Sequence, residues 1–387
     1  MPNPGQSSHC NRREFLRRGA ALAVGLPFLP PLASALADAP AAPNAKVAIA
    51  KCVSYGPETR AAMARCFDVL GGVAPLVRGK TVTVKLNLTG ADFSPFLGRP
   101  VGETFMTHGA TVMALLALLF DAGAKRVRLV ESTPRTAVLE DTLIEAGWDV
   151  RALNALGNVD CENTRNLGKS KSYVRLTVPG GGCMFSAFQF NRAYGDTDVM
   201  ISMAKLKRHV TAGVTLSMKN LFGITPNSLY SSQAGDESAT DGRGTLHGEA
   251  SAPIPLPGMK RDVPYRDGFT RVPRITVDIC AARPIDIAIV DGITAMNGGE
   301  GPWASQAAKI RVTTPGVLIV GLNPVSTDAV ATAVMGYDNP RAARGVHPFD
   351  YCDNHLLLAE QAGLGTADLS RIDVRGLTVA QARYPYD

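Results

Sequence analysis

A basic segment in the middle of the chain carries the residues best suited to bind an anion. It reads Lys205-Leu206-Lys207-Arg208-His209. If this segment is extended, Lys205, Lys207 and His209 lie on one face, because strand side chains repeat every two residues. A basic strand that runs into a helix start suits a phosphate, sulfate or carboxylate, since backbone N–H groups add to the lysine charges. The alternative is a solvated basic turn.

The apolar spacing after this segment predicts a helix over Thr211–Phe222 that stops at Gly223. Thr211, Thr215 and Lys219 form an i, i+4 stripe beside the apolar stripe of that helix. Lys219 and its neighbour Asn220 are therefore expected at the edge of the core. We predict catalytic roles for His209 and Lys219, and substrate-binding roles for Lys205, Lys207 and Asn220.

Polar residues also follow other predicted strands. One strand ends in Lys85-Leu86-Asn87, and the next ends in Glu131-Ser132-Thr133. Ligands of open parallel sheets bind beyond the carboxyl ends of the strands, so Lys85 and Asn87 are predicted to bind substrate. Loops are polar in any case, so each strand end taken alone is also compatible with an ordinary loop.

Acidic residues occur in the glycine-rich stretch from Asp291 to Pro302. Asp291 follows a predicted strand, and Glu300 lies between two glycines. Carboxylates in such a turn can ligate a divalent cation, so both residues are candidate metal ligands. The alternative is a plain glycine-rich turn.

Two histidines outside the basic segment are further candidates. His108 precedes a predicted helix, where it is a candidate catalytic base or a helix cap. His247 lies in a Gly- and Ser-rich stretch and could belong to a lid. The sequence contains no Gly-x-Ser-x-Gly elbow, Walker loop or His-Glu-x-x-His motif, which disfavours a serine hydrolase, an NTPase and a zincin.

The elements that position these residues alternate along the chain between short apolar runs and helical stretches. This alternation predicts βαβ units and an α/β fold with a mainly parallel sheet, built as one large domain or as two lobes. The predicted strands are Lys46–Ser54, Thr81–Leu88, Arg126–Glu131, Trp148–Leu153, Asp198–Met203, Ile285–Asp291, Val317–Gly321 and Ile372–Val374. The predicted helices are Glu58–Leu70, Thr111–Ala122, Ala137–Ala146, Thr211–Phe222, Val272–Ala282, Asp328–Met335 and Asn354–Ala362.

The middle of the chain is less regular. Runs at Tyr173–Val178 and Cys183–Phe188 flank three glycines and resemble a hairpin. Residues 226–269 are rich in Gly, Ser, Pro and Asp and are too long for an ordinary connection, which predicts an irregular excursion or a lid. We assign residues 46–376 to the α/β domain and 377–387 to a C-terminal tail.

The N-terminus has the order of features found in a signal peptide. Arg12-Arg13 precede Glu14-Phe15-Leu16, an apolar stretch runs from Gly19 to Leu29, and Ala35-Leu36-Ala37 form a small-x-small cleavage site. Paired arginines indicate the twin-arginine (Tat) route, with residues 1–37 removed and 38–45 as a linker. The apolar stretch is too short to span a bilayer, so we expect no stable membrane anchor after cleavage. The alternatives are a basic tail and an uncleaved anchor.

Charge and cysteine content narrow the range of partners. The predicted signal peptide holds four arginines against one glutamate, which is half of the formal charge of +6. No Lys/Arg-rich run with interleaved aromatics remains after it, so no nucleic-acid partner is expected. The seven cysteines form no Cys-x-x-Cys pair, so no iron–sulfur cluster is expected. Disulfides and buried thiols are both compatible with their scattered spacing.

The residues taken together resemble the domain of unknown function 362 family. The most specific part is Lys205-x-Lys207-x-His209 followed by Lys219-Asn220-x-x-Gly223, and the resemblance extends roughly from Val47 to Gly376. It implies that Asp328, in Thr327-Asp328-Ala329-Val330, joins the site as a third candidate metal ligand. Many members carry ferredoxin-like cysteine motifs, which this sequence lacks, so electron transfer through a built-in cluster is not expected here.

Two functions follow as expectations. The first is an exported, periplasmic enzyme that acts on a small anionic substrate, with the need for a divalent metal or a preloaded cofactor left open. The second is a periplasmic binding or carrier protein for an anion, metal or cofactor. The expected partners are the Tat translocase during export and a small anionic ligand.

Overall fold

The structure of the chain is a computed structural model that describes residues 45–240, 242–248, 256–261, 267–304 and 310–386. These residues belong to one compact unit. The predicted signal peptide lies outside the described residues. Within the described ranges, no helix has the length and apolar character needed to cross a membrane.

A single eight-stranded sheet runs through this unit, in the order β14-β1-β13-β10-β7-β2-β3-β4. All neighbours pair in parallel except β13, which is antiparallel to both β1 and β10. The predicted α/β fold with a mainly parallel sheet is therefore confirmed, and one sheet takes the place of two lobes. The strands are β1 (Lys46–Lys51), β2 (Thr81–Lys85), β3 (Arg126–Glu131), β4 (Val159–Asn163), β7 (Val199–Lys205), β10 (Ile287–Gly292), β13 (Val317–Gly321) and β14 (Asp373–Gly376).

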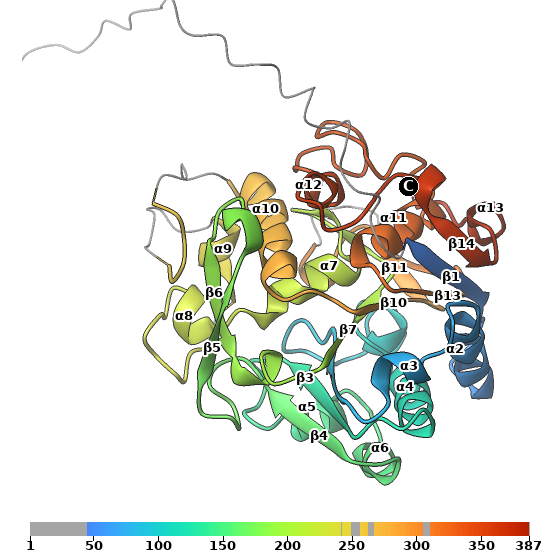
Figure 1. The fold of residues 1–387 in the computed structure, drawn as a ribbon, viewed down its shortest axis with the longest axis horizontal. Coiled ribbons are helices and arrows are strands. Elements are labelled where there is room, and N and C mark those ends of the chain that lie inside the picture. The colour runs from blue at the N-terminus through green and yellow to red at the C-terminus, as the bar shows by residue number, and fades with distance from the viewer. Residues whose placement is uncertain (1–44, 241, 249–255, 262–266, 305–309, 387) are drawn as a thin grey trace, which may run out of the picture. The chain divides into compact units, whose positions relative to one another are not determined.

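Helices cover both faces of the sheet, which explains why its central strands are mostly apolar on both faces. In β10, Ile287 and Ile289 belong to the core shared with α2 (Pro57–Val69) and α4 (Gly109–Asp121). Ala288 and Val290 belong to the opposite core, with α7 (Leu216–Asn220), α10 (Gly268–Ala282) and α11 (Pro324–Val334). Figure 1 shows these two sets of helices on either side of the sheet.

Smaller elements surround these layers. A hairpin of β5 (Tyr173–Thr177) and β6 (Ala187–Asn191) confirms the predicted pairing, but its second strand begins later than the predicted run over Cys183–Phe188. The remaining elements are α3 (Ala74–Val77), α5 (Leu139–Glu145), α6 (Val150–Ala155), α8 (Asn227–Tyr230), α9 (Gly244–His247), α12 (His355–Gln361), α13 (Val379–Ala382), β8 (Arg208–His209), β9 (Gly213–Val214), β11 (Ala295–Asn297) and β12 (Arg311–Thr313). Short 3-10 turns are η2 (Val101–Glu103), η3 (Pro179–Gly181), η4 (Arg192–Tyr194), η5 (Leu221–Ile224), η6 (Pro302–Ala304) and η7 (Leu369–Arg371).

The strand order reverses direction between β2 and β7. After β2 the chain proceeds to β3 and β4 on one side, whereas after β7 it proceeds to β10 and β13 on the other. The connections leaving these two neighbouring strands therefore separate beyond their carboxyl ends. Such a switch point is where open α/β sheets leave a crevice for ligands.

The predicted strand over Trp148–Leu153 is wrong. That segment contains the start of helix α6, and the strand follows it as β4. Apolar and polar residues alternate in this segment, which imitates a strand. Asp149 nevertheless caps the helix, because its carboxylate accepts from the backbone N–H of Ala152.

The predicted helix over Thr211–Phe222 is also shorter than expected. Gly213 adopts a positive φ of 74° in β9, and a Cβ there would lie 2.5 Å from the ring of Phe349. Leu216 is left-handed as well, with φ 48°, and the α-helix covers only Leu216–Asn220 before the chain continues as the 3-10 turn η5. The i, i+4 stripe from Thr211 to Lys219 therefore does not exist.

The two segments predicted to be irregular contain ordered parts. Within residues 226–269, α8 and α9 are helical, while residues 241, 249–255 and 262–266 lie outside the described residues. The predicted tail includes α13 and then Tyr386, which is buried. The Tyr386 hydroxyl donates to the carbonyl of Leu206 (2.7 Å) and lies 2.9 Å from the hydroxyl of Thr313.

We predict that Tyr386→Phe lowers the free energy of unfolding by about 1–2 kcal/mol, because two buried polar groups lose a partner. Urea denaturation measures the change. Tyr384→Phe is the matched control, since the Tyr384 hydroxyl has no hydrogen bond to the described residues, and it should change stability by less than about 0.5 kcal/mol. Equal effects of the two variants would contradict the role given to Tyr386.

Candidate functional site

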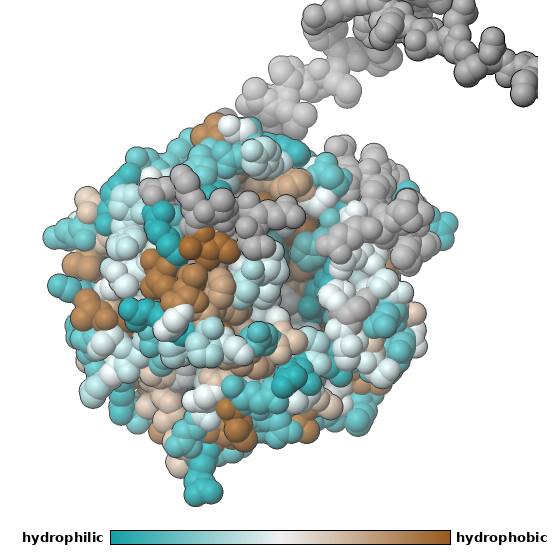
Figure 2. Space-filling model, turned by 180° about the vertical axis from the view of Figure 1, so that it is seen from behind, coloured by the Kyte–Doolittle hydropathy of each residue, from teal (hydrophilic) through white to brown (hydrophobic). Residues whose placement is uncertain are grey.

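A cavity of about 780 Å³ opens beyond the carboxyl ends of β2, β3 and β7, at the switch point of the sheet. Figure 2 shows the face opposite to that of Figure 1, which is hollowed beside a patch of hydrophobic side chains. The charged and histidine side chains among the lining residues are Lys85, Glu131, Lys207, His209, Lys219, Arg243, His247 and Glu300. Seven predicted site residues line this cavity: Lys85, Asn87, Lys207, His209, Lys219, Asn220 and Glu300.

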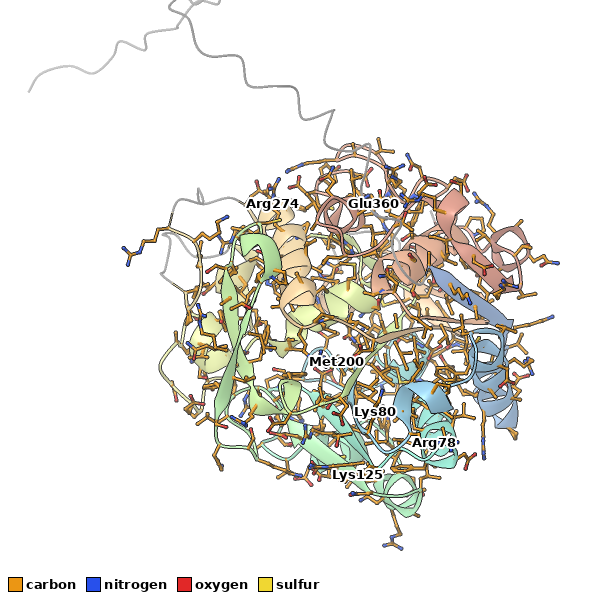
Figure 3. The ribbon with its side chains drawn as sticks, in the orientation of Figure 1. Arg78, Lys80, Lys125, Met200, Arg274 and Glu360 are labelled. Atoms are coloured by element: carbon orange, nitrogen blue, oxygen red, sulfur yellow. The ribbon has the colours of Figure 1, made fainter. Side chains whose placement is uncertain are left out.

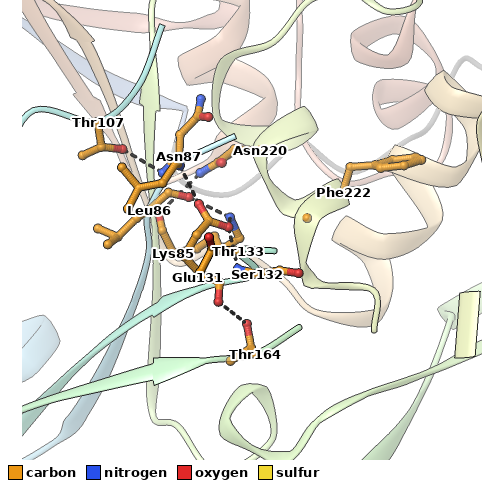
Figure 4. A network of polar contacts seen from close by, with 12 residues as sticks. Lys85, Leu86, Asn87, Thr107, Glu131, Ser132, Thr133, Thr164, Asn220 and Phe222 are labelled. Atoms are coloured by element: carbon orange, nitrogen blue, oxygen red, sulfur yellow. Dashed lines mark hydrogen bonds and ion pairs between the residues drawn. The ribbon is translucent and has the colours of Figure 1, made fainter. Parts of the chain in front are cut away.

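A buried ion pair forms the floor of the cavity. The ammonium of Lys85 lies 2.6 Å from Glu131 Oε1, and the two side chains are 2% and 5% exposed. Glu131 also accepts from the backbone N–H groups of Leu88 and Ser132, so its carboxylate joins the ends of β2 and β3 (Figure 4). Gly223 lies close to this pair, and a Cβ there would lie 3.1 Å from Lys85 Nζ.

Two asparagines lie next to the ion pair. Asn220 donates from Nδ2 to the hydroxyl of Ser202 at 3.1 Å, which ties α7 to β7. Asn87 is only 5% exposed, and its Nδ2 has no hydrogen-bond partner among the described residues. A buried amide donor without a partner costs about 1–3 kcal/mol, so an acceptor is expected to complete it.

Lys219 is the least satisfied cation of the cavity. It is 8% exposed, and within the described ranges its ammonium makes no hydrogen bond or ion pair. Its contact is the ring of Phe222, whose centroid lies 4.2 Å from Nζ. Burial lowers the pKa of Lys219 to about 7, and the charges of Arg243 and Lys85 act in the same direction against the opposing effect of Glu300.

Lys207 and Glu300 form the wall next to Lys219. The ammonium of Lys207 donates to the carbonyls of Phe105 and Glu300, both at 2.8 Å. Burial lowers its pKa to about 7 although the Glu300 carboxylate opposes the shift. Glu300 in turn accepts from the backbone N–H of Val210 and from the indole of Trp303.

The two cavity histidines are held in opposite tautomers by their hydrogen bonds. His209 Nδ1 accepts from the backbone N–H of Thr211 (3.1 Å), so the proton of its neutral ring is on Nε2. His247 Nδ1 lies 2.8 Å from the carbonyl of Arg243 and must donate to it, so its Nε2 carries a lone pair. Burial lowers both pKa values, that of His209 well below its usual range and that of His247 to about 4.

Arg243 connects the segment over residues 226–269 to the sheet. Its guanidinium donates to Ser132 Oγ at the end of β3, and to the carbonyls of Gly223 and Thr225 after α7. These bonds fix α9, and with it His247, over the cavity. The strand-end rule indicates Glu131, but no sequence signal indicates Arg243.

Three other predicted residues, Lys205, Asp291 and His108, form a separate cluster beside the ends of β7 and β10. The Lys205 ammonium lies 3.2 Å from Asp291 and donates to Tyr55 and to the carbonyl of Gly102. Tyr55 stacks on His108 with ring centroids 3.6 Å apart, and His108 Nδ1 caps α4. Lys205, Asp291 and His108 do not line the cavity. His108 Nδ1 accepts from the Ala110 N–H, and burial lowers the pKa of the ring to about 4.

Asp328 positions Lys219 from a distance. It lies inside α11, not at the start of a helix as expected, and its carboxylate accepts from Ser217 N, Ser217 Oγ and Met218 N. It therefore caps α7 directly after the left-handed Leu216. Burial raises the pKa of Asp328 to about 7.

The predicted metal ligands do not come together. Asp291 is bound by Lys205 and Tyr55, Asp328 by the start of α7, and Glu300 by Val210 and Trp303. Among the described residues, no group of three or more His, Cys, Asp or Glu side chains could hold a metal ion. The described donor set therefore does not fit a divalent cation. The six described cysteines are free thiols, and only Cys183 is not fully buried.

Positive charge alone does not mark the site. Arg78, Lys80 and Lys125 precede β2 and β3, so they lie at the amino ends of these strands, away from the cavity (Figure 3). The Lys80 ammonium is satisfied there by the carbonyl of Leu76. What distinguishes the cavity is that one of its cations, Lys219, and one amide, that of Asn87 Nδ2, are buried without an acceptor among the described residues.

Fold and site together define an α/β protein with a basic cavity at the switch point of its sheet. The model of the family described as Domain of unknown function (DUF362) matches residues 82–333, and the chain belongs to this family. No curated protein matches the sequence. A crystal structure of a protein from Thermotoga maritima is similar at 14% identity and a TM-score of 0.33, covering 63% of this chain and 52% of that one.

Lys219→Met is predicted to stabilise the protein near neutral pH. The pKa of Lys219 is about 7 in the folded chain and near 10.4 in the unfolded chain. Between these values the unfolded chain binds more protons, so the folded state becomes more stable as the pH rises from about 7 to about 10. Below about pH 7 Lys219 is charged in both states, and the full cost of burying its ammonium is present. The variant should gain roughly 1–3 kcal/mol at about pH 6, and the gain should shrink toward about pH 10.

Urea denaturation at several pH values measures this gain. Lys207→Met is the matched comparison, because the pKa of Lys207 is also about 7 but its ammonium has two acceptors, the carbonyls of Phe105 and Glu300. Its stability should change with pH in the same direction, but the net gain should be smaller at every pH, because both carbonyls lose their donor. A Lys219→Met variant that is destabilised at low pH would show that the ammonium has a favourable partner.

Proposed function

We propose that this protein is an enzyme that binds a small anion in the basic cavity and transfers a proton to or from it. The observation that carries the proposal is Lys219, an ammonium that is nine-tenths buried, faces the cavity and has no acceptor among the described residues. The unpartnered amide of Asn87 supports it independently. An anion would satisfy both groups.

The charge of the cavity supports an anionic ligand. Its described lining contains four cationic side chains, Lys85, Lys207, Lys219 and Arg243, against the carboxylates of Glu131 and Glu300. Both carboxylates already accept hydrogen bonds from the protein. A bound anion would raise the pKa values of Lys207 and Lys219 and favour their charged forms.

The histidines support proton transfer. The lone pair on His247 Nε2 can accept a proton from the ligand, and the N–H on His209 Nε2 can donate to an oxygen where negative charge develops. Lys219, near both rings, would stabilise that charge. The Asp328 cap and the left-handed Leu216 would hold Lys219 in place while the charge develops.

The alternative, a binding or carrier protein, has one observation in its favour. Each cavity carboxylate is fixed by protein donors, so the described lining offers no free carboxylate base. A carrier needs only the cations and the amide. Turnover therefore decides between the two functions.

We predict that Lys219→Met weakens the binding of inorganic phosphate or sulfate by at least about tenfold, measured by isothermal titration calorimetry. The buried ammonium is the main uncompensated charge, so its loss removes an unscreened attraction. Lys80→Met, at the amino end of β2, is the control and should bind the anion with wild-type affinity. Equal affinity of Lys219→Met and the wild type would contradict the proposed site.

His247→Gln separates the enzyme from the carrier. For an enzyme, turnover of organic anions should fall by about 10²–10⁴-fold while anion affinity stays within a few fold, because the proton acceptor is lost and the cations remain. His347→Gln, outside the cavity, is the control. Ligand binding without turnover by the wild type across a broad panel of organic anions would favour the carrier.

We also propose that the Tat translocase exports the protein to the periplasm, on the basis of Arg12-Arg13 and the apolar stretch that follows. Replacing both arginines with lysine should retain the precursor in the cytoplasm, as measured by cell fractionation. Replacing Arg17 and Arg18 in the same way preserves the net charge and should permit export. Retention by both double variants would mean that charge, not the arginine pair, matters.

A further inference from the structure

Trp303 presents an indole ring to the cavity at its outer end. The residue lines the cavity and is 49% exposed, whereas the other tryptophan, Trp148, is buried. A large apolar side chain that is half open to solvent has not been used to build the core. Its position in a cavity wall is that of a ligand contact.

The ring of Trp303 is held in place. Its Nε1 donates to Glu300 Oε1 at 3.2 Å, and Phe105 packs at right angles to it with centroids 5.7 Å apart. The same Glu300 residue supplies the carbonyl that binds Lys207. Glu300 therefore holds both the indole of Trp303 and the ammonium of Lys207 in the cavity wall.

Two glycines make room for this ring. A Cβ on Gly301 would lie 2.5 Å from the six-membered ring of the indole, and a Cβ on Gly90 would lie 3.0 Å from it. Gly90 also has a positive φ of 96°. Side chains at either position would push the ring away, so the local sequence keeps the indole where it is.

The size of the cavity points to an extended ligand. Cavities of roughly 300–1,000 Å³ enclose organic molecules of drug size, whereas an inorganic anion fills only a small part of such a volume. At about 780 Å³, this cavity has space beyond the groups that contact Lys219 and Asn87. Among the described lining residues, Trp303 and Phe222 offer the apolar aromatic rings.

We propose that the ligand of this cavity is an organic anion with a flat ring, its anionic group on Lys219 and Asn87 and its ring packed against Trp303. This inference rests on the proposed anion site and specifies the class of molecule that occupies it. The ring adds apolar and π contact with the indole. The charged group is a phosphate ester or a carboxylate, which share the chemistry that Lys219 and Asn87 recognise.

The test compares probes that differ only in the ring. Isothermal titration calorimetry of the full chain measures the affinity for phenyl phosphate against methyl phosphate, and for benzoate against acetate. In at least one pair the ring compound should bind about tenfold more tightly or better. Trp303→Leu should reduce that preference to less than about threefold, while Trp303→Phe should keep most of it.

Fluorescence provides a second measurement. The chain has two tryptophans, so the signal that remains in Trp303→Phe belongs to Trp148. Subtracting it should leave a Trp303 emission that phenyl phosphate or benzoate quenches and that their ring-free partners do not. Lys219→Met should abolish this quenching at the same probe concentrations, because the ring and the anion bind as one molecule.

The outcomes separate this inference from the proposed function. If ring-bearing and ring-free probes bind with equal affinity, and Lys219→Met weakens both, the anion site stands and the ring contact is overturned. If the ring preference persists in Trp303→Leu, the inference is also overturned. If no probe, including inorganic phosphate, binds in a Lys219-dependent way, the proposed anion site itself fails.

Discussion

The divergence of the chain at the ends of β2 and β7 is the constraint from which the cavity follows. These strands are neighbours in a parallel sheet, but the connections that leave them go to opposite sides. No local turn can close the gap above them, so side chains must line it. The Lys85–Glu131 pair, held by the N–H groups of Leu88 and Ser132, gives this gap a polar and rigid floor.

The rest of the site is assembled from outside the sheet. Asp328 on α11 caps the short helix that carries Lys219, and Arg243 fixes the segment that carries His247. Buried charges of one sign are unfavourable without partners, so elements far apart in the sequence must hold them there. In the proposed function, a bound anion is the partner that Lys219 lacks among the described residues.

Much of the fold could be predicted from the sequence, because strands buried on both faces are short apolar runs. The predicted bounds of β3 and β13 agree with the structure. The segment over Trp148–Leu153 could not be assigned from alternation alone, since α6 imitates the period of a strand. The helix over Thr211–Phe222 failed because Gly213 and Leu216 take left-handed conformations that tertiary contacts impose.

The candidate site was predictable where it depends on strand ends and not where it depends on side-chain direction. Lys85 and Asn87 follow β2 and line the cavity, as the position of the strand end indicates. Lys205 lies in the same basic motif as Lys207, yet it points to Asp291 and Tyr55. Arg243 reaches the cavity from a segment whose sequence indicates only a loop.

The low pKa values of the cavity lysines have a thermochemical consequence. Lys207 and Lys219 each have a pKa of about 7, so near neutral pH each is only partly protonated. An anion that makes both fully charged draws protons from the surrounding buffer. The heat of association therefore includes the ionisation enthalpy of the buffer, and its slope across buffers counts the protons that accompany each molecule of ligand.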